Sequence, residues 1–157
     1  MKIHRFEVQQ NLPIGLDEAW SFFSSPRNLD LITPDDMSFE IVSGADSKAY
    51  SGQLITYKIK PLLNIPMNWV TEITQCVDKK YFIDEQRFGP YKFWHHQHHF
   101  EATKDGVLMK DILHYALPYG FVGELMGKIL LHKKVQNIFD YREQKLNDIF
   151  KTELVIA

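Results

Sequence analysis

The residue pattern changes its period once, after Pro118, and this change constrains the fold more than any other feature. Before it, short segments that alternate apolar and polar residues are separated by turn residues, as in the strands of an antiparallel sheet. After it, residues 121–150 contain no proline and only two glycines, and their apolar residues recur at helical spacing. At roughly 1.5 Å per residue, such a helix is about 45 Å long. The chain is therefore expected to pack one long helix against one sheet.

The expected elements follow from the same patterns. Residues 2–10 predict a first strand, a short helix begins at Asp17, and residues 28–32 predict a further helical turn. Turn residues then separate six more segments with strand patterns, at 38–43, 52–59, 67–77, 81–88, 93–103 and 107–117. We therefore expect an α+β fold, in which a curved seven-stranded antiparallel sheet wraps around a long C-terminal helix, with two short helices after the first strand.

Length and composition exclude several classes of protein. A chain of 157 residues, 45% hydrophobic and 24% charged, predicts a single globular domain over residues 1–157, with 151–157 as a frayed tail. The formal net charge of −2 offers no general attraction for nucleic acid. The single Cys76 cannot form a disulfide within the chain. There is no secretion signal and no apolar run of transmembrane length, so we expect a cytoplasmic protein that is not inserted in a membrane.

Four of the seven histidines lie within residues 95–99. In a strand, alternate residues share a face, so His96 and His98 lie on one face and His95 and His99 on the other. The first face also carries Trp94 and Phe100, and its larger apolar content places it inside. On the following strand the same argument places Met109, Asp111 and Tyr115 inside. The histidines therefore divide between the two faces and do not form one metal cluster.

The turn at Asp105-Gly106 allows two registers between these strands. A two-residue loop sets His98 opposite Leu113 and Phe100 opposite Asp111. A four-residue loop, from Thr103 to Gly106, sets His98 opposite Asp111 instead. In both registers the side chains keep their faces, so His98 and Asp111 are neighbours either way.

Several motifs occur in a characteristic order over residues 2–150. They are Ala19-Trp20-Ser21-Phe22-Phe23, Ser25-Pro26-Arg27-Asn28-Leu29, Ile32-Thr33-Pro34, Trp69, Phe82-Ile83-Asp84-Glu85-Gln86, Gly89-Pro90-Tyr91, residues 94–100, Asp111, and residues 115–120. This set resembles the START-like helix-grip superfamily (SRPBCC), whose fold is shared with birch-pollen-allergen-like proteins and polyketide cyclases. It is most similar to a bacterial branch in which some members are encoded with, or joined to, an NAD-dependent epimerase-like protein.

The resemblance implies a cavity between the sheet and the long helix, which binds a hydrophobic or amphipathic small molecule. Its motif also implies that the face of residues 82, 84 and 86 points inward. Aromatic residues would hold the body of the ligand, and a group of His, Asp and Gln residues would contact its polar end. The expected ligand-binding residues are Tyr57, Trp69, Phe82, Asp84, Gln86, Trp94, His96, His98, Phe100, Met109, Asp111 and Tyr115.

Other interpretations of the inner polar residues stay open at this stage. The first interpretation is a buried hydrogen-bond network. The second is a cyclase- or dehydratase-type enzyme, in which Asp111 and either His96 or His98 act as general acid and base. A third possibility is a structural partner of an epimerase-like protein. No nucleophile and no cofactor motif is evident, so we expect a binding protein rather than an enzyme, and no cofactor. A His-x-His metal site with Asp84 or Asp111 lacks the fourth ligand of a structural zinc site, so we expect no metal.

The remaining candidate residues have structural explanations. We expect Trp20 and Phe23 in the core, and Cys76 as an unreactive thiol on the face opposite Trp69. The resemblance places residues 27–29 in a loop at the cavity mouth, where they cap a helix or gate entry. The solvated face of the long helix is expected to carry Lys128, Lys133, Lys134, Arg142 and Lys145.

Overall fold

The computed structural model describes residues 2–60, 65–118 and 120–153, with the side chains of 120–131 and 151–153 left out of the description. Seven strands form one antiparallel sheet in the order β1-β7-β6-β5-β4-β3-β2. Their bounds are β1 (His4–Leu12), β2 (Glu40–Ser43), β3 (Gln53–Ile59), β4 (Met67–Val77), β5 (Tyr81–Phe88), β6 (Phe93–Thr103) and β7 (Gly106–Ala116). The expected α+β architecture is confirmed, and β4, β5 and β6 have the bounds that alternation predicted.

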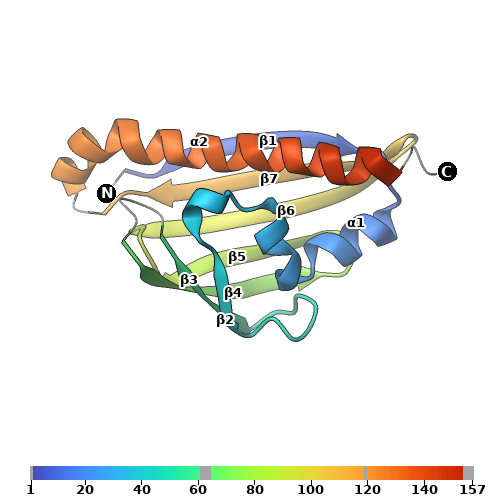
Figure 1. Ribbon diagram of the computed structural model, residues 1–157, viewed down its shortest axis with the longest axis horizontal. Helices are drawn as coiled ribbons and strands as arrows, with labels where there is room; N and C mark the ends of the chain where they lie inside the picture. Colours follow the sequence, from blue (N-terminus) through green and yellow to red (C-terminus); the bar gives the residue numbers. More distant parts are fainter. Residues whose placement is uncertain (1, 61–64, 119, 154–157) are drawn as a thin grey trace.

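The helices lie on one side of the curved sheet (Figure 1). They are α1 (Leu16–Phe23), the 3₁₀ helices η1 (Pro26–Ile32) and η2 (Asp35–Met37), and α2 (Gly120–Glu153). Helix α2 runs along β1 and β7, and α1 and η1 lie beside it (Figure 1). It continues to Glu153, past the expected end near Phe150, and residues 154–157 of the expected tail lie outside the described residues. Within the described part of the chain, none of the helices is long and apolar enough to cross a membrane.

The hairpin between β6 and β7 adopts the second of the two registers, with His98 opposite Asp111 and Thr103 opposite Gly106. Gly106 has a φ of 143°, and a Cβ atom built there would lie 2.1 Å from the carbonyl oxygen of Leu12 on β1. Only glycine fits such a conformation at so close an approach. The β6–β7 hairpin therefore contacts the end of β1 at Gly106, which is the only glycine in the hairpin.

A bulge in β4 reverses the expected orientation of Cys76. The pairing of β4 with β5 shifts between Ile73 and Gln75, so the chain gains one residue relative to its partner strand. Beyond the bulge, Cys76 pairs with Phe82, which faces the core, and its thiol lies 3.3 Å from the carbonyl oxygen of Ala49. The sequence-based orientation of Cys76 was wrong, because alternation counts residues as though no bulge interrupted them.

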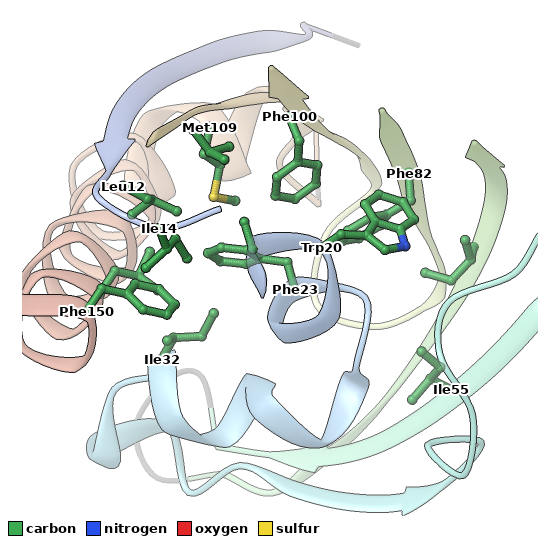
Figure 2. Close-up of a cluster of buried hydrophobic side chains, with 14 of the residues drawn as sticks. Leu12, Ile14, Trp20, Phe23, Ile32, Ile55, Phe82, Phe100, Met109 and Phe150 are labelled. Carbon is green, nitrogen blue, oxygen red and sulfur yellow. The ribbon is translucent and has the colours of Figure 1, made fainter. Parts of the chain in front are cut away.

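Aromatic residues of α1 join it to the sheet (Figure 2). Trp20 packs edge-on against Phe100, with 5.6 Å between the ring centroids, and Phe23 lies 5.4 Å from the same ring. Leu12 and Phe150 belong to the same buried cluster, so β1 and the end of α2 close around α1. Trp20 and Phe23 both lie in the core cluster, as expected, and Phe23 also lines the cavity described below.

Candidate functional site

A cavity of about 180 Å³ lies among the sheet, η1 and α2, and apolar side chains form most of its wall. The sheet contributes Ile55, Tyr57, Ile59, Trp69, Phe82 and Trp94, and the helices contribute Phe23, Leu29, Ile138 and Phe139. One water molecule needs about 10–15 Å³ of such space. The cavity is therefore large enough for a small organic molecule as well as for several waters.

The cavity wall contains seven of the residues expected from the sequence, namely Tyr57, Trp69, Phe82, Asp84, Trp94, His96 and His98. Among the described residues, five others expected there do not line it, namely Gln86, Phe100, Met109, Asp111 and Tyr115. The inner face of the sheet is thus as expected, but that face is longer than the cavity. Residues near its ends pack into the core or bond to neighbouring elements.

These five residues have other contacts in the fold. Gln86 holds a turn, because its Nε2 donates to the carbonyl of Tyr91 at 2.6 Å and its Oε1 accepts from the Tyr91 amide at 3.1 Å. Phe100 and Met109 belong to the core cluster, and the Tyr115 hydroxyl contacts Nδ1 of His132. Asp111 lies behind the two inner histidines.

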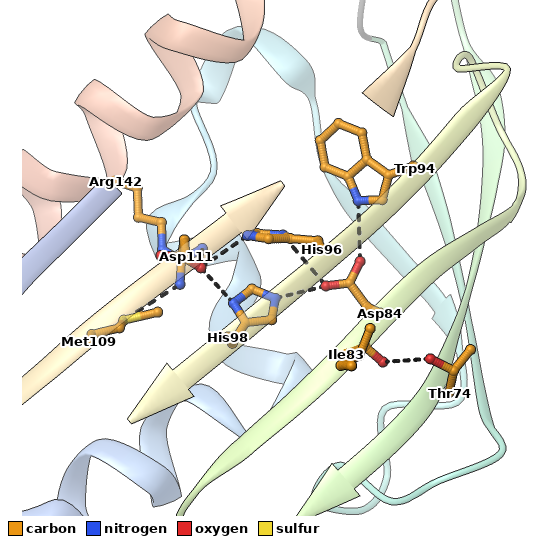
Figure 3. A network of polar contacts seen from close by, with 9 residues as sticks. All are labelled: Thr74, Ile83, Asp84, Trp94, His96, His98, Met109, Asp111 and Arg142. Carbon is orange, nitrogen blue, oxygen red and sulfur yellow. Dashed lines mark hydrogen bonds and ion pairs between the residues drawn. The ribbon is translucent and has the colours of Figure 1, made fainter. Parts of the chain in front are cut away.

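The two inner histidines lie between two carboxylates (Figure 3). His98 Nε2 is 2.7 Å from Oδ2 of Asp84, and His98 Nδ1 is 2.7 Å from Oδ1 of Asp111. His96 Nε2 is 3.0 Å from Asp111 Oδ1, and His96 Nδ1 is 3.5 Å from Asp84 Oδ2. The contact at His98 Nδ1 is short but lacks the direction of a hydrogen bond, so we count it as an ion contact. Each imidazole therefore touches both carboxylates.

Outside the cluster, His95 and His99 lie on the other face of β6, as expected, but they are half-buried and not fully exposed to solvent. His95 Nδ1 contacts Glu85 at 2.7 Å, and Gln97 bridges the rings of His95 and His99. The tract is divided between the two faces, as alternation predicted.

Arg142 belongs to the inner cluster, and the expectation that it lies on the solvated face of α2 was wrong. It is 8% exposed, its Nη1 lies 3.6 Å from Asp111 Oδ1, and its guanidinium lies over the ring of Phe23 at 5.4 Å. Val135, Phe139 and Leu146 are buried on the same helix, at spacings of three and four residues that include position 142. This spacing was the sequence signal that could have placed Arg142 on the buried face of α2. It was overlooked because charged residues surround Arg142 in the sequence.

Mutual contacts move the pKa values within the cluster in opposite directions. Burial and the charge on His98 lower the pKa of His96. Burial alone would also lower the pKa of His98, but its contacts with Asp111 and Asp84 raise it. Burial opposes ionisation of Asp111, yet Arg142 and the two imidazoles hold its pKa well below the usual value. Asp84 is also lowered in pKa, because its contacts with His98 and His96 outweigh its burial.

Two carboxylates therefore face one guanidinium and two imidazoles. The contacts with Asp111 and Asp84 favour the charged form of His98, whereas burial disfavours the charged form of His96. Burying charge is unfavourable unless the charges are paired. This pairing explains how four ionisable residues of the sheet and one of α2 are buried together.

Three buried donors in the cavity wall have no hydrogen-bond partner within the described protein. They are the hydroxyl of Ser24, the indole Nε1 of Trp69 and the Nε of Arg142. Buried donors in folded proteins are almost always bonded to something. Sequence reasoning missed both Ser24 and Arg142 as site residues. For Ser24 there was no signal, since a lone serine after a helix carries no distinctive pattern.

Residues 27–29, expected at the mouth, make specific contacts. Asn28 and Leu29 line the cavity, and Asn28 Nδ2 donates to the carbonyl of Phe22 at 2.9 Å. Arg27 bonds to Asp46 at 2.8 Å. Of the two roles considered for this loop, the contact from Asn28 supports helix capping, because it satisfies a carbonyl in the last turn of α1.

Comparison with known proteins identifies the fold. A scan against models of protein families gives no match, and no curated protein matches the sequence. Among solved structures, protein CV1439 from Chromobacterium violaceum matches with a TM-score of 0.72 at 9% identity, over 93% of this chain and 96% of that chain. Major latex-like protein 151 from Panax ginseng matches with a TM-score of 0.67 at 13% identity, over 94% and 97%. Ara h 8.0201 matches with a TM-score of 0.58 at 16% identity, over 94% and 99%.

The expected epimerase-like partner finds no support in these similarities. The resemblance found in the sequence is confirmed at the level of the fold, over nearly the whole chain. This chain has the same helix-grip fold as these solved structures, over nearly its whole length.

Proposed function

We propose that the protein binds an amphipathic small molecule in the cavity between the sheet and α2. The observation that carries this proposal is an apolar cavity whose wall contains three buried donors that have no partner among the described residues, on Ser24, Trp69 and Arg142. Apolar pockets with a few fixed polar groups are the common form of small-molecule sites. The ligand would place its apolar body against the aromatic wall and a hydrogen-bond acceptor at these donors.

The pairing of charges in the site favours a neutral acceptor. Asp84 and Asp111 are already paired with His98 and Arg142, so a ligand does not have to supply charge. A carbonyl oxygen accepts two hydrogen bonds and would satisfy two of the three donors. We therefore expect the polar end of the ligand to be a ketone, ester or similar carbonyl group. This differs from the sequence-based expectation that Gln86 and Asp111 contact the polar end.

A pair of molecules with one skeleton tests the polar contact. Menthone carries a ring carbonyl, and menthane is the same skeleton without it. On metal-free protein, competition against 1-anilinonaphthalene sulfonate should show menthone binding about fivefold more tightly than menthane, because one net hydrogen bond contributes about 1 kcal/mol. Trp69→Phe should remove most of this preference while retaining an aromatic ring. Ser25→Ala, at a lining residue outside the unpartnered set, should leave the preference unchanged.

Filling the cavity tests whether binding occurs there at all. Ala49 lines the cavity and Ala102 is exposed on β6. Ala49→Phe should weaken menthone binding at least tenfold, and Ala102→Phe should not. Equal binding by wild type and Ala49→Phe would refute the proposal, and so would equal affinity for menthone and menthane.

A second candidate function is general acid–base catalysis on a ligand held in the same cavity. It is favoured by the adjacent rings of His96 and His98, whose centroids are 3.9 Å apart and which both line the cavity. Opposite pKa shifts in neighbouring groups are typical of acid and base pairs. Turnover of a cyclisable or dehydratable substrate that is lost in His98→Gln would support it.

The cytoplasmic location and the single-domain organisation of the protein stay predictions.

A further inference from the structure

Three polar atoms from three residues converge at one point of the cavity wall. Nδ1 of His96 and Nε2 of His98 lie 3.5 and 2.7 Å from Oδ2 of Asp84, and the ligand atoms of these residues lie within 4.8 Å of one another. Zinc binds nitrogen and oxygen at about 2.0–2.1 Å, which separates two tetrahedral ligand atoms by about 3.3 Å. The two separations from Asp84 bracket this value. Small rotations of the side chains would give the three atoms a common centre.

The opposite polar atom of each of these side chains is held by a neighbour (Figure 3). Asp111 Oδ1 lies 3.0 Å from His96 Nε2 and 2.7 Å from His98 Nδ1, and the Trp94 indole donates to Asp84 Oδ1 at 3.3 Å. In metal sites, a carboxylate commonly binds the ring nitrogen that the metal leaves exposed, which orients the imidazole. Asp111 binds the Nε2 atom of His96 in this way and forms an ion contact with the Nδ1 atom of His98.

We infer that Asp84, His96 and His98 form a binding site for a divalent transition metal such as zinc, with Asp111 as the positioning residue. All three ligand residues line the cavity, and Asp111 does not. A metal held at this point keeps one coordination position directed toward the space where a small molecule fits. Three protein ligands and one open position are typical of metal sites that bind or activate a ligand.

The structure answers the objection that the sequence raised against a metal. A structural zinc site needs four protein ligands, but a site that opens on a cavity needs only three. Two imidazoles and one carboxylate suit zinc, iron(II) and cobalt(II). The inference goes beyond the proposed function, because it depends on the geometry of the cluster and not on an organic ligand.

Cobalt(II) provides a direct test on the untagged, metal-stripped full-length protein. We expect one equivalent of cobalt to bind and to produce the visible absorption of a low-coordinate nitrogen and oxygen site. One equivalent of zinc should displace it. Absence of this absorption, or a spectrum showing sulfur coordination, would overturn the inference and leave a buried hydrogen-bond network.

Variants on the two faces of β6 provide matched controls. His96→Gln and His98→Gln should each lower cobalt affinity at least a hundredfold, while His95→Gln and His99→Gln on the outer face should leave it within twofold. Asp111→Asn should lower affinity about 10- to 100-fold with the stoichiometry of one retained, as expected for a positioning residue. Equal losses for inner and outer variants would contradict the assigned ligands.

X-ray absorption of the zinc-loaded wild-type protein keeps the test independent of whether the variants fold. Two imidazoles and no sulfur in the first coordination sphere would support the site, and fewer than two imidazoles would overturn it. The menthone experiment uses metal-free protein, so failure of the metal site and failure of the proposed function are distinguishable.

Discussion

Asp111 on β7 and Arg142 on α2 form a buried ion contact, with 3.6 Å between Oδ1 and Nη1. Their side chains are only 7% and 10% exposed. The contact connects the long helix to the sheet at the inner cluster, where Asp111 also touches both imidazoles. Because little water reaches these buried charges, each side chain is stabilised by the opposite charge of the other.

Removing one of these two charges should destabilise the protein strongly. Asp111→Asn preserves the shape of the side chain but leaves Arg142 without a counter-charge, and we expect a loss of about 3 kcal/mol in the free energy of unfolding. Urea denaturation of metal-free protein measures this loss. The double variant with Arg142→Met should lose less than the sum of the two single variants. Additive losses, or a loss below about 1 kcal/mol for Asp111→Asn, would contradict the pairing.

Substitutions at Gly106 and Gly52 separate two costs of adding a side chain, namely backbone strain at positive φ and steric overlap with neighbouring atoms. Both have positive φ, but a Cβ at Gly106 would clash with the Leu12 carbonyl, whereas a Cβ at Gly52 would meet no described residue within 4 Å apart from its chain neighbours. Gly52→Ala should cost about 1 kcal/mol from its backbone conformation alone. Gly106→Ala should cost about 2–5 kcal/mol, because overpacking adds to the same strain. Similar midpoints of urea denaturation for the two variants would show that the close approach to β1 is absent.

Gln86 should contribute to stability and not to ligand binding. Gln86→Leu removes both hydrogen bonds to the backbone of Tyr91, a buried residue. We expect a loss of about 1–3 kcal/mol in the free energy of unfolding, with menthone affinity unchanged. Gln75→Leu, at an exposed position of β4, is the control and should change stability by less than about 0.5 kcal/mol. Weaker menthone binding by Gln86→Leu would contradict this prediction and indicate that Gln86 contributes to the binding site.

The thiol of Cys76 should react slowly near neutral pH. Burial and the nearby charge of Asp78 raise its pKa, so a smaller fraction is present as the reactive thiolate than in free cysteine. The rate of alkylation by iodoacetamide should therefore rise with pH and have its midpoint above that of free cysteine, which is about 8.5. Asp78→Asn should move the midpoint to lower pH, and Glu101→Gln should not. A midpoint at or below that of free cysteine would contradict the inward orientation found here.

Local patterns predicted most of the secondary structure and the division of the histidine tract. The bounds of β4, β5 and β6 agree with those expected, because alternation and turn residues act within a few positions of one another. The same alternation placed His96 and His98 inside. It could not locate the bulge at Thr74, since the extra residue is defined only by pairing with β5.

The sequence by itself determined the order of the elements, the long helix and the inward faces of His96, His98 and Asp111, because these depend on periods of two and 3.6 residues within one segment. Only the tertiary structure decided which partners those residues meet. A register shift of two residues leaves every face unchanged, so alternation alone could not choose the register that pairs His98 with Asp111. The burial of Arg142 likewise depended on how α2 is rotated against a sheet formed by residues far away in the chain.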